Sequence, residues 1–220
     1  MPDAIRARCE SCGIRGKQLK RILVYYAHPG HRTSTVNRPM AKAAQSIDNI
    51  NFFDLYRLYP RHDINVAVEQ QRILAADVIV FQCPVFWYST PSIIKEWQDL
   101  VLEHGFAYGT NGDRLEGKCM MLAITAAGSP EAYTPNGHQH YPLRTFLTPL
   151  EQTARLCRMH FLAPYVMFSS LQAEEKNQLK AHVDGYVRLL EALRDGTYDL
   201  EAAGKADVVS HATLPIHGDP

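Results

Sequence analysis

Short apolar runs alternate with longer segments of mixed polarity along most of the chain. Apolar runs of about four to eight residues bounded by polar or turn residues are typical of buried strands. Runs of this kind predict strands at residues 22–27, 50–55, 78–82, 120–125 and 162–168. The intervening segments repeat apolar side chains with the helical period. Helices are therefore predicted at residues 34–46, 66–76, 91–103, 143–157 and 173–194.

This alternation of strands and helices predicts one α/β domain over residues 21–196, with a parallel sheet. Right-handed crossovers with helices on both faces give a doubly wound sheet of five strands in the order 2-1-3-4-5. Ligands of such sheets bind at the carboxyl ends of the strands, so function is expected in the loops there. Residues 1–20 are expected to form a flexible arm. Residues 197–220 lack an apolar face and are expected to be extended, disordered, or packed on a second subunit.

Lys and Arg together number 23, as do Asp and Glu, so the formal net charge is zero at pH 7. This balance argues against nucleic acid as a partner, and also against a small acidic electron carrier. No apolar run approaches the roughly 18 residues of a membrane span, and charges stand where a signal peptide would be apolar. Five cysteines, an odd number, suit a reducing compartment. The sequence therefore predicts a cytoplasmic protein.

Hydroxyl and amide side chains gather after the first predicted strand, where the chain enters a helix. Ser34, Thr35 and Asn37 belong to this group. Free N–H groups and the dipole at a helix N-terminus favour an anion, so the loop is a candidate phosphate site. A helix simply capped by Thr33 or Ser34 explains the same residues as well. The loop contains neither a dinucleotide-binding G-x-G-x-x-G nor a P-loop sequence.

Three consecutive aromatic residues, Phe86, Trp87 and Tyr88, follow the third predicted strand. Pro84 ends the strand, and Pro91 suits the first turn of the next helix, so the loop between them is short and rigid. Such a loop can form a flat wall against a fused-ring ligand, and its backbone N–H groups can reach the ring's heteroatoms. The alternative is that the three rings pack beneath the helix.

The fourth predicted strand ends in small residues that let a ligand approach the backbone closely. A polar stretch with candidate hydrogen-bond donors comes next, although histidines in such a stretch are more often solvated surface residues. The candidates after this strand are Thr125, Ala126, Ala127, Gly128, Tyr133, His138 and His140.

The most specific motifs are Phe-Gln-Cys-Pro-Val-Phe-Trp-Tyr-Ser at 81–89 and His-Gly-Phe-Ala-Tyr-Gly at 104–109. Others are found at 26–29, 54–56, 59–60, 69–70, 94–97, 115–118 and 157–161. Together they resemble the flavodoxin-like NAD(P)H:quinone oxidoreductases, the group that includes DT-diaphorase. The closer resemblance is to ancillary proteins of the glutathione-gated potassium-efflux systems. It covers about residues 21–195.

This resemblance implies a flavodoxin-like fold, a homodimer and a bound flavin, either FMN or FAD. It places the flavin phosphate on His28, Ser34, Thr35, Val36 and Asn37, and the isoalloxazine ring on Pro84, Val85, Phe86, Trp87 and Tyr88. Residues 125–128 line the other edge of the ring, where the usual Thr-Thr-Gly-Gly is Thr-Ala-Ala-Gly. A Tyr and a His assist hydride transfer in related enzymes. Tyr133 matches the Tyr, whereas His138 and His140 straddle the position of the His.

The function that this resemblance implies is two-electron reduction of a quinone by NAD(P)H, in which the two substrates use one flavin site in turn. The alternative is a regulatory subunit of a potassium-efflux transporter, peripheral on the inner face of the membrane. Hydrolysis has little support, because the chain lacks a G-x-S-x-G sequence. Cys9 with Cys12, and Cys157 with His160, are incomplete ligand sets, so no metal site is predicted.

Overall fold

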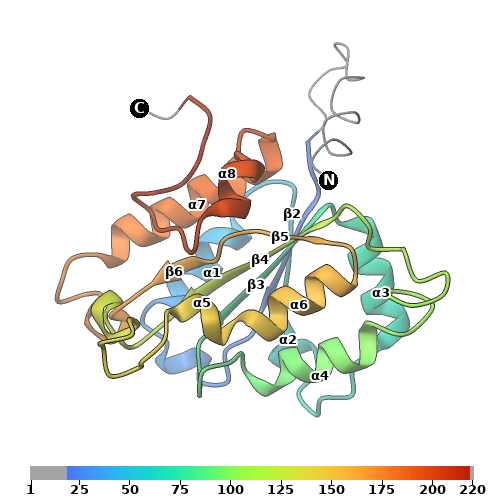
Figure 1. Ribbon diagram of the computed structural model, residues 1–220, viewed down its shortest axis with the longest axis horizontal. Helices are drawn as coiled ribbons and strands as arrows, with labels where there is room; N and C mark the ends of the chain where they lie inside the picture. Colours follow the sequence, from blue (N-terminus) through green and yellow to red (C-terminus); the bar gives the residue numbers. More distant parts are fainter. Residues whose placement is uncertain (1–18, 219–220) are drawn as a thin grey trace.

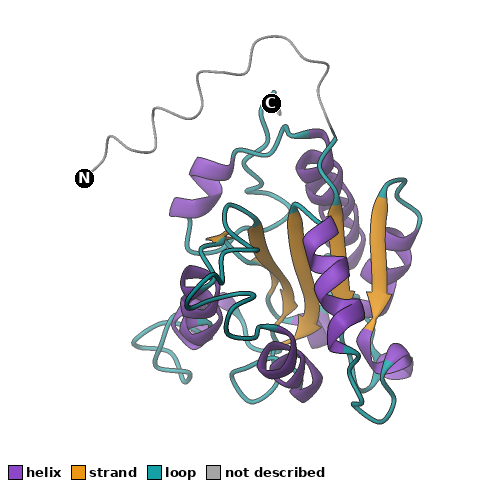
Figure 2. Cartoon of the chain, turned by 90° about the vertical axis from the view of Figure 1, so that its right-hand side faces the viewer, coloured by secondary structure: helices purple, strands orange, loops and turns teal. Residues whose placement is uncertain are grey.

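The computed structural model describes residues 19–218. Its strands are β1 (Ile22–Tyr26), β2 (Ile50–Asp54), β3 (Val78–Pro84), β4 (Cys119–Thr125), β5 (His160–Phe161) and β6 (Tyr165–Met167). All pairings are parallel, in the order β2-β1-β3-β4-β5, with β6 also beside β4. The arrowheads therefore gather at one edge of the sheet (Figure 2). The doubly wound sheet predicted from the sequence is confirmed.

Helices cover both faces of this sheet (Figures 1 and 2). They are α1 (Asn37–Gln45), α2 (Leu55–Leu58), α3 (Val66–Ala75), α4 (Ser92–Val101), α5 (Leu143–Phe146), α6 (Thr148–Leu156), α7 (Leu179–Asp195) and α8 (Leu200–Lys205). The core has two parts, one on each face of the sheet, and alternate residues of β1 point into different parts, because successive strand side chains point to opposite faces. Ile22 and Val24 pack with α1 and α7, whereas Leu23 and Tyr25 pack with α3, α4 and α6.

The fifth strand, predicted at 162–168, is divided: β5 lies just before this range, at His160–Phe161, and β6 lies within it. Phe161 pairs with Met120 and Tyr165 with Ala123, so four steps along this strand match three along β4. The extra residue makes a bulge. Pro164 lies within it and has no N–H to donate, which is why the apolar run is not one continuous strand.

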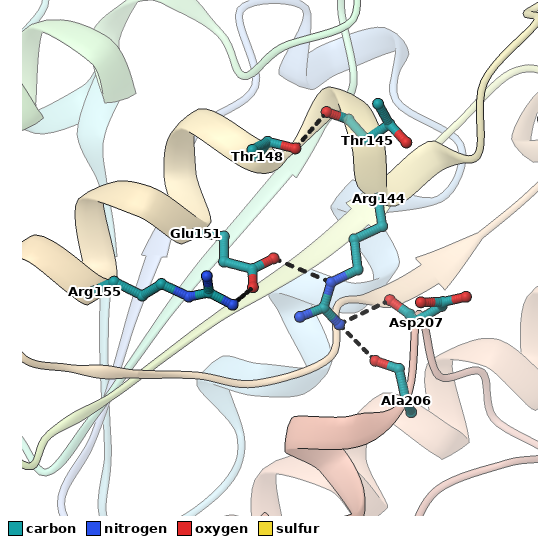
Figure 3. Close-up of polar contacts among 7 residues, drawn as sticks. All are labelled: Arg144, Thr145, Thr148, Glu151, Arg155, Ala206 and Asp207. Carbon is teal, nitrogen blue, oxygen red and sulfur yellow. Dashed lines mark hydrogen bonds and ion pairs between the residues drawn. The ribbon is translucent and has the colours of Figure 1, made fainter. Parts of the chain in front are cut away.

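The helix predicted at 143–157 is also divided, into α5 and α6. Pro149 has no N–H for the carbonyl of Thr145, which accepts a bond of 2.8 Å from the Thr148 hydroxyl instead (Figure 3). The helix predicted at 173–194 begins only at Leu179, because Asn177 has a left-handed backbone with a φ of 52°. Apolar periodicity does not detect either interruption.

The C-terminal segment differs from the expectation that it has no apolar surface to bury. Residues 197–218 contain α8, and Tyr198, Ala203 and Val209 are buried against the same chain. Of the expected N-terminal arm, residues 1–18 lie outside the described part, as do Cys9 and Cys12. None of the helices between residues 19 and 218 has the length and apolarity that a membrane crossing requires.

A buried carboxylate joins the helices on one face of the fold to the sheet. Glu69 of α3 is fully buried and accepts hydrogen bonds from Tyr59 at 2.6 Å and from the Trp97 indole at 3.0 Å. It also accepts one from Tyr25 and pairs with Arg72. These donors satisfy a charge that would be costly to bury alone, so Glu69 holds α3 and α4 to β1.

Candidate functional site

Two adjoining cavities lie at the carboxyl ends of the strands. The first, here called the polar cavity, has a volume of about 350 Å³. The second, the aromatic cavity, has about 490 Å³. Val85, Phe86 and Ala127 line both, so the two cavities adjoin at these residues. The polar cavity is further lined by His28, Thr33, Ser34, Thr35, Val36, Asn37, Pro84, Thr125, Ser170 and Leu171, and the aromatic cavity by Trp87, Tyr88, Gly128, Tyr133 and Gln139.

Buried hydrogen bonds fix the polar cavity to the sheet. Asn37, the first residue of α1, donates to the hydroxyl of Thr125 at 2.7 Å, and its carbonyl accepts from the Gln82 amide at 2.8 Å. Its backbone N–H donates to the Ser34 hydroxyl at 3.1 Å. The start of α1 is thus held against β3 and β4. A helix start that faces a polar cavity favours an anion there.

His28 borders the polar cavity as a neutral ring. Its pKa is lowered, first because it is partly desolvated and second because His31 is close. The Nδ1 atom accepts the backbone N–H of Gly30 at 3.1 Å, so the neutral ring carries its proton on Nε2. The His28 ring also lies edge-on to Phe86, with 5.8 Å between the centroids. His28 therefore offers the cavity a neutral N–H donor.

The aromatic residues form a very tight turn. Phe86 and Ser89 exchange two backbone hydrogen bonds of 2.9 and 3.0 Å around Trp87 and Tyr88. Trp87 and Tyr88 both have left-handed backbones, with φ of 49° and 65°, as in a type I′ turn. The turn presents Trp87 with 93% of its surface exposed. The alternative that all three rings pack beneath the helix therefore does not hold.

Some backbone groups of these loops already have partners in the protein. The N–H groups of Val85 and Phe86 donate to Thr125 and Ser89, and that of Ala126 donates to Met167 at 2.8 Å. These three groups are therefore not free to bind a ring. Gly128 is needed for space, because a Cβ there would lie 2.9 Å from the ring of Tyr133.

The polar loop after β4 contributes Tyr133 and Gln139 to the aromatic cavity. The pKa of Tyr133 is raised, mainly by desolvation and also by the nearby Tyr88. His138, His140 and Ala126 line neither of the two cavities described above. The Nε2 atom of His138 lies 3.1 Å from the amide nitrogen of Gln139. His138 therefore approaches the cavity only through Gln139.

Comparison with known proteins agrees with this architecture. A model of the flavodoxin-like fold family matches residues 20–190. The chain belongs to this flavodoxin-like family. The potassium-efflux ancillary protein KefG of Cronobacter sakazakii is 39% identical over 173 residues, 79% of this chain and 94% of that protein.

Solved structures of other flavodoxin-like proteins are also similar. General stress protein 14 of Treponema denticola, solved in complex with FMN, is 32% identical with a TM-score of 0.73, over 79% of this chain and 99% of that one. An NADPH-quinone reductase of P. pentosaceus is 25% identical with a TM-score of 0.69, over 76% and 96% of the two chains.

Four cavity residues of this flavodoxin-like chain were not among the predicted site residues. Thr33 was considered only as a helix cap. Ser170 and Leu171 follow β6, at the same edge of the sheet as the other loops. The rule that placed ligands after each strand could have found them, because it applies to the fifth strand too. No sequence pattern pointed to Gln139 as a cavity residue, because its loop has no periodicity.

Proposed function

We propose that the protein is a flavin-dependent NAD(P)H:quinone oxidoreductase. The observation that carries this proposal is that a polar, anion-favouring cavity adjoins an aromatic one at the carboxyl ends of parallel strands. Related proteins support it, since one was solved with FMN and another is an NADPH-quinone reductase. A bound flavin would take a hydride from a nicotinamide and deliver two electrons to a quinone.

The residues present suit a flavin, with FMN as the first choice and FAD as the alternative. Ser34, Thr35 and the start of α1 would bind the phosphate, since backbone and hydroxyl donors meet the helix dipole there. His28 would add a neutral donor. Val36 and Asn37 would line the same end.

The aromatic cavity would hold the ring system. Phe86, Trp87 and Tyr88 would border one side of it, and Ala127 and Gly128 would allow close approach on the other. Tyr133 and the Gln139 amide would offer hydrogen bonds where negative charge develops. In this proposal His138 acts by orienting Gln139, and His140 has no direct role.

One opening would serve both substrates in turn, with the oxidised nicotinamide leaving before the quinone binds. The aromatic cavity has about 490 Å³, within the range of ordinary small-molecule sites. Trp87 and Leu171, exposed by 93% and 80%, are apolar side chains at the cavity rims. We propose that a second copy of the chain covers them in a homodimer.

The test is to bind FMN or FAD to the purified protein and to follow the flavin absorbance while NAD(P)H and then a quinone are added without oxygen. We expect the band to bleach with NAD(P)H and to return with the quinone. Phe86→Ala should weaken flavin binding, whereas Leu100→Ala, at a similarly exposed apolar residue outside both cavities, should not. A flavin that binds but is reduced by neither nucleotide would contradict the enzymatic proposal.

The relative KefG favours a second function, that of a cytoplasmic ancillary subunit on a potassium-efflux transporter. This function requires a surface for the transporter but no turnover. Co-purification with membranes that contain the transporter, together with altered potassium efflux, would support it. Full quinone reductase activity without any effect on efflux would argue against it.

A further inference from the structure

The chain continues beyond the residues that the family model matches and folds back on its own sheet. Residues 197–218 are here called the C-terminal strap; they follow α7 after a left-handed turn at Gly196. The strap bonds to the outer edge of the split fifth strand. Ala163 donates to Ala203 at 2.8 Å, and Val166 donates to Val209 at 2.9 Å. The strap thus pairs an edge that would otherwise be open (Figure 1).

The strap also reaches Arg144 of α5 (Figure 3). One guanidinium nitrogen donates to the carbonyls of Ala206 and Asp207, at 2.5 and 3.2 Å. The Nε atom donates to Glu151 of α6 at 3.1 Å. The side chain of Arg144 is only 18% exposed. Its planar, multiple donors suit a position where several acceptors from different elements converge.

Arg144 lies two residues before Phe146, which supports the aromatic cavity from behind. The ring of Phe146 lies 4.9 Å from that of Tyr88 and 6.2 Å from that of Tyr133, between centroids. Tyr88 and Tyr133 both line the cavity. A helix of four residues such as α5 has little stability of its own, so its position depends on such anchors.

We propose that the C-terminal strap positions the aromatic cavity through Arg144. The carbonyls at 206 and 207 hold the guanidinium, the guanidinium holds α5, and α5 sets the place of Phe146 behind Tyr88 and Tyr133. Arg144 is a positioning residue in this account. The contacts that lead from the strap to Phe146 are features of the structure itself. Their effect on turnover rests on the proposed function.

Hydrogen exchange of the flavin-free protein tests the positioning. We expect Arg144→Ala to speed exchange of residues 130–147 about tenfold or more, an opening cost lower by about 1.4 kcal/mol. Arg155→Ala is the matched control, because Arg155 pairs with Glu151 but not with the strap. It should leave this exchange unchanged. Unchanged exchange in Arg144→Ala would overturn the proposal.

A second variant separates the strap from the Arg144–Glu151 pair. Val209→Pro removes the N–H that donates to Pro164 at 2.8 Å and leaves Arg144 intact. If the strap positions the cavity, Val209→Pro should also speed exchange at 130–147 while exchange in β3 and β4 stays slow. An effect in Arg144→Ala but none in Val209→Pro would mean that Glu151 alone anchors α5, and would overturn the role of the strap.

Kinetics of the flavin-loaded protein supply a readout that general destabilisation does not give. Arg144→Ala should raise the KM for the quinone severalfold with kcat changed less than twofold. A loss of folded protein would instead lower kcat at constant KM. Failure of the wild type to bind flavin would defeat the proposed function but leave the exchange experiment valid, so the two failures are distinguishable.

Discussion

Trp87 and Tyr88 are held in a backbone conformation that glycine adopts far more easily. Left-handed non-glycine residues cost on the order of 1–3 kcal/mol each and persist where the surroundings enforce them. Here two backbone hydrogen bonds between Phe86 and Ser89 close the turn. Strain of this kind gathers at functional sites, which agrees with the place of Trp87 and Tyr88 in the lining of the aromatic cavity.

Relieving the strain at Trp87 should stabilise the protein and weaken the ligand site. Asn tolerates the left-handed region, and Trp87 is 93% exposed, so little packing is lost. We expect Trp87→Asn to raise the free energy of unfolding by about 1 kcal/mol and to weaken flavin binding about tenfold. Urea unfolding without flavin and a fluorescence titration measure both. Trp87→Phe keeps an aromatic ring and the strained backbone, so this variant should resemble the wild type. A Trp87→Asn protein that is less stable than the wild type would refute the argument.

Gln139 rather than a histidine is expected to matter most in the loop after β4. We predict that Gln139→Leu slows reduction by NAD(P)H about tenfold, the equivalent of one lost hydrogen bond. His138→Leu should slow it only twofold to threefold, because His138 acts through Gln139. His140→Leu should have no effect. Stopped-flow absorbance measures the rates, and a larger loss in His140→Leu than in Gln139→Leu would contradict this order.

Residue by residue, the sequence indicated most of the cavity lining because hydroxyl and aromatic residues cluster in loops after apolar runs. It did not single out Gln139. The position of Gln139 at the cavity depends on local turns, including the left-handed backbone of His140, and no sequence periodicity encodes such turns.

At the scale of elements, apolar runs located β1 to β4, β6 and the long helices, since burial dictates their pattern, but β5 at His160–Phe161 lies just outside the predicted run. Breaks within a strand or a helix were not predicted by the apolar pattern. Pro164 and Pro149 break hydrogen bonding without interrupting the apolar run of the strand or the helical period. Such single-residue effects require the partner strand or the preceding carbonyl to be known.

Helix α7 carries a buried histidine that makes stability depend on pH. His182 is fully buried, and among the described residues neither ring nitrogen has a hydrogen-bond partner. Its ring stacks on Tyr165 with centroids 4.4 Å apart and meets His211 of the strap edge-on. Desolvation, with a smaller effect of His211, lowers the pKa of His182 from 6.5 to about 3. The unfolded chain therefore takes up a proton that the folded chain resists.

Stability should fall as pH drops below about 6.5, the ordinary pKa of histidine in the unfolded chain. By pH 5 the loss attributable to His182 should reach about 2 kcal/mol. We expect His182→Leu to remove this part of the pH dependence and to be close to the wild type in stability at pH 8. Urea unfolding between pH 5 and 8 measures it, with His160→Leu, at an exposed histidine, as the control. An unchanged slope in His182→Leu would show that other groups cause the acid loss.

At the scale of the whole molecule, parallel strands bring loops that are far apart in sequence to one edge of the sheet. The sequence could therefore indicate which loops would form one site. The C-terminal strap was not foreseen, because its buried residues Tyr198, Ala203 and Val209 follow no periodic pattern. Their contacts exist only once the split fifth strand offers its outer edge.

The most direct test of the central claim is the affinity for FMN relative to riboflavin, which lacks the phosphate. The wild type should bind FMN at least about tenfold more tightly. Ser34→Asp keeps an acceptor for the N–H of Asn37, so folding should persist, but its charge should repel the phosphate and remove most of this preference. Ser46→Asp, at the other end of α1, should retain it. Equal affinities in the wild type, or an intact preference in Ser34→Asp, would contradict the account.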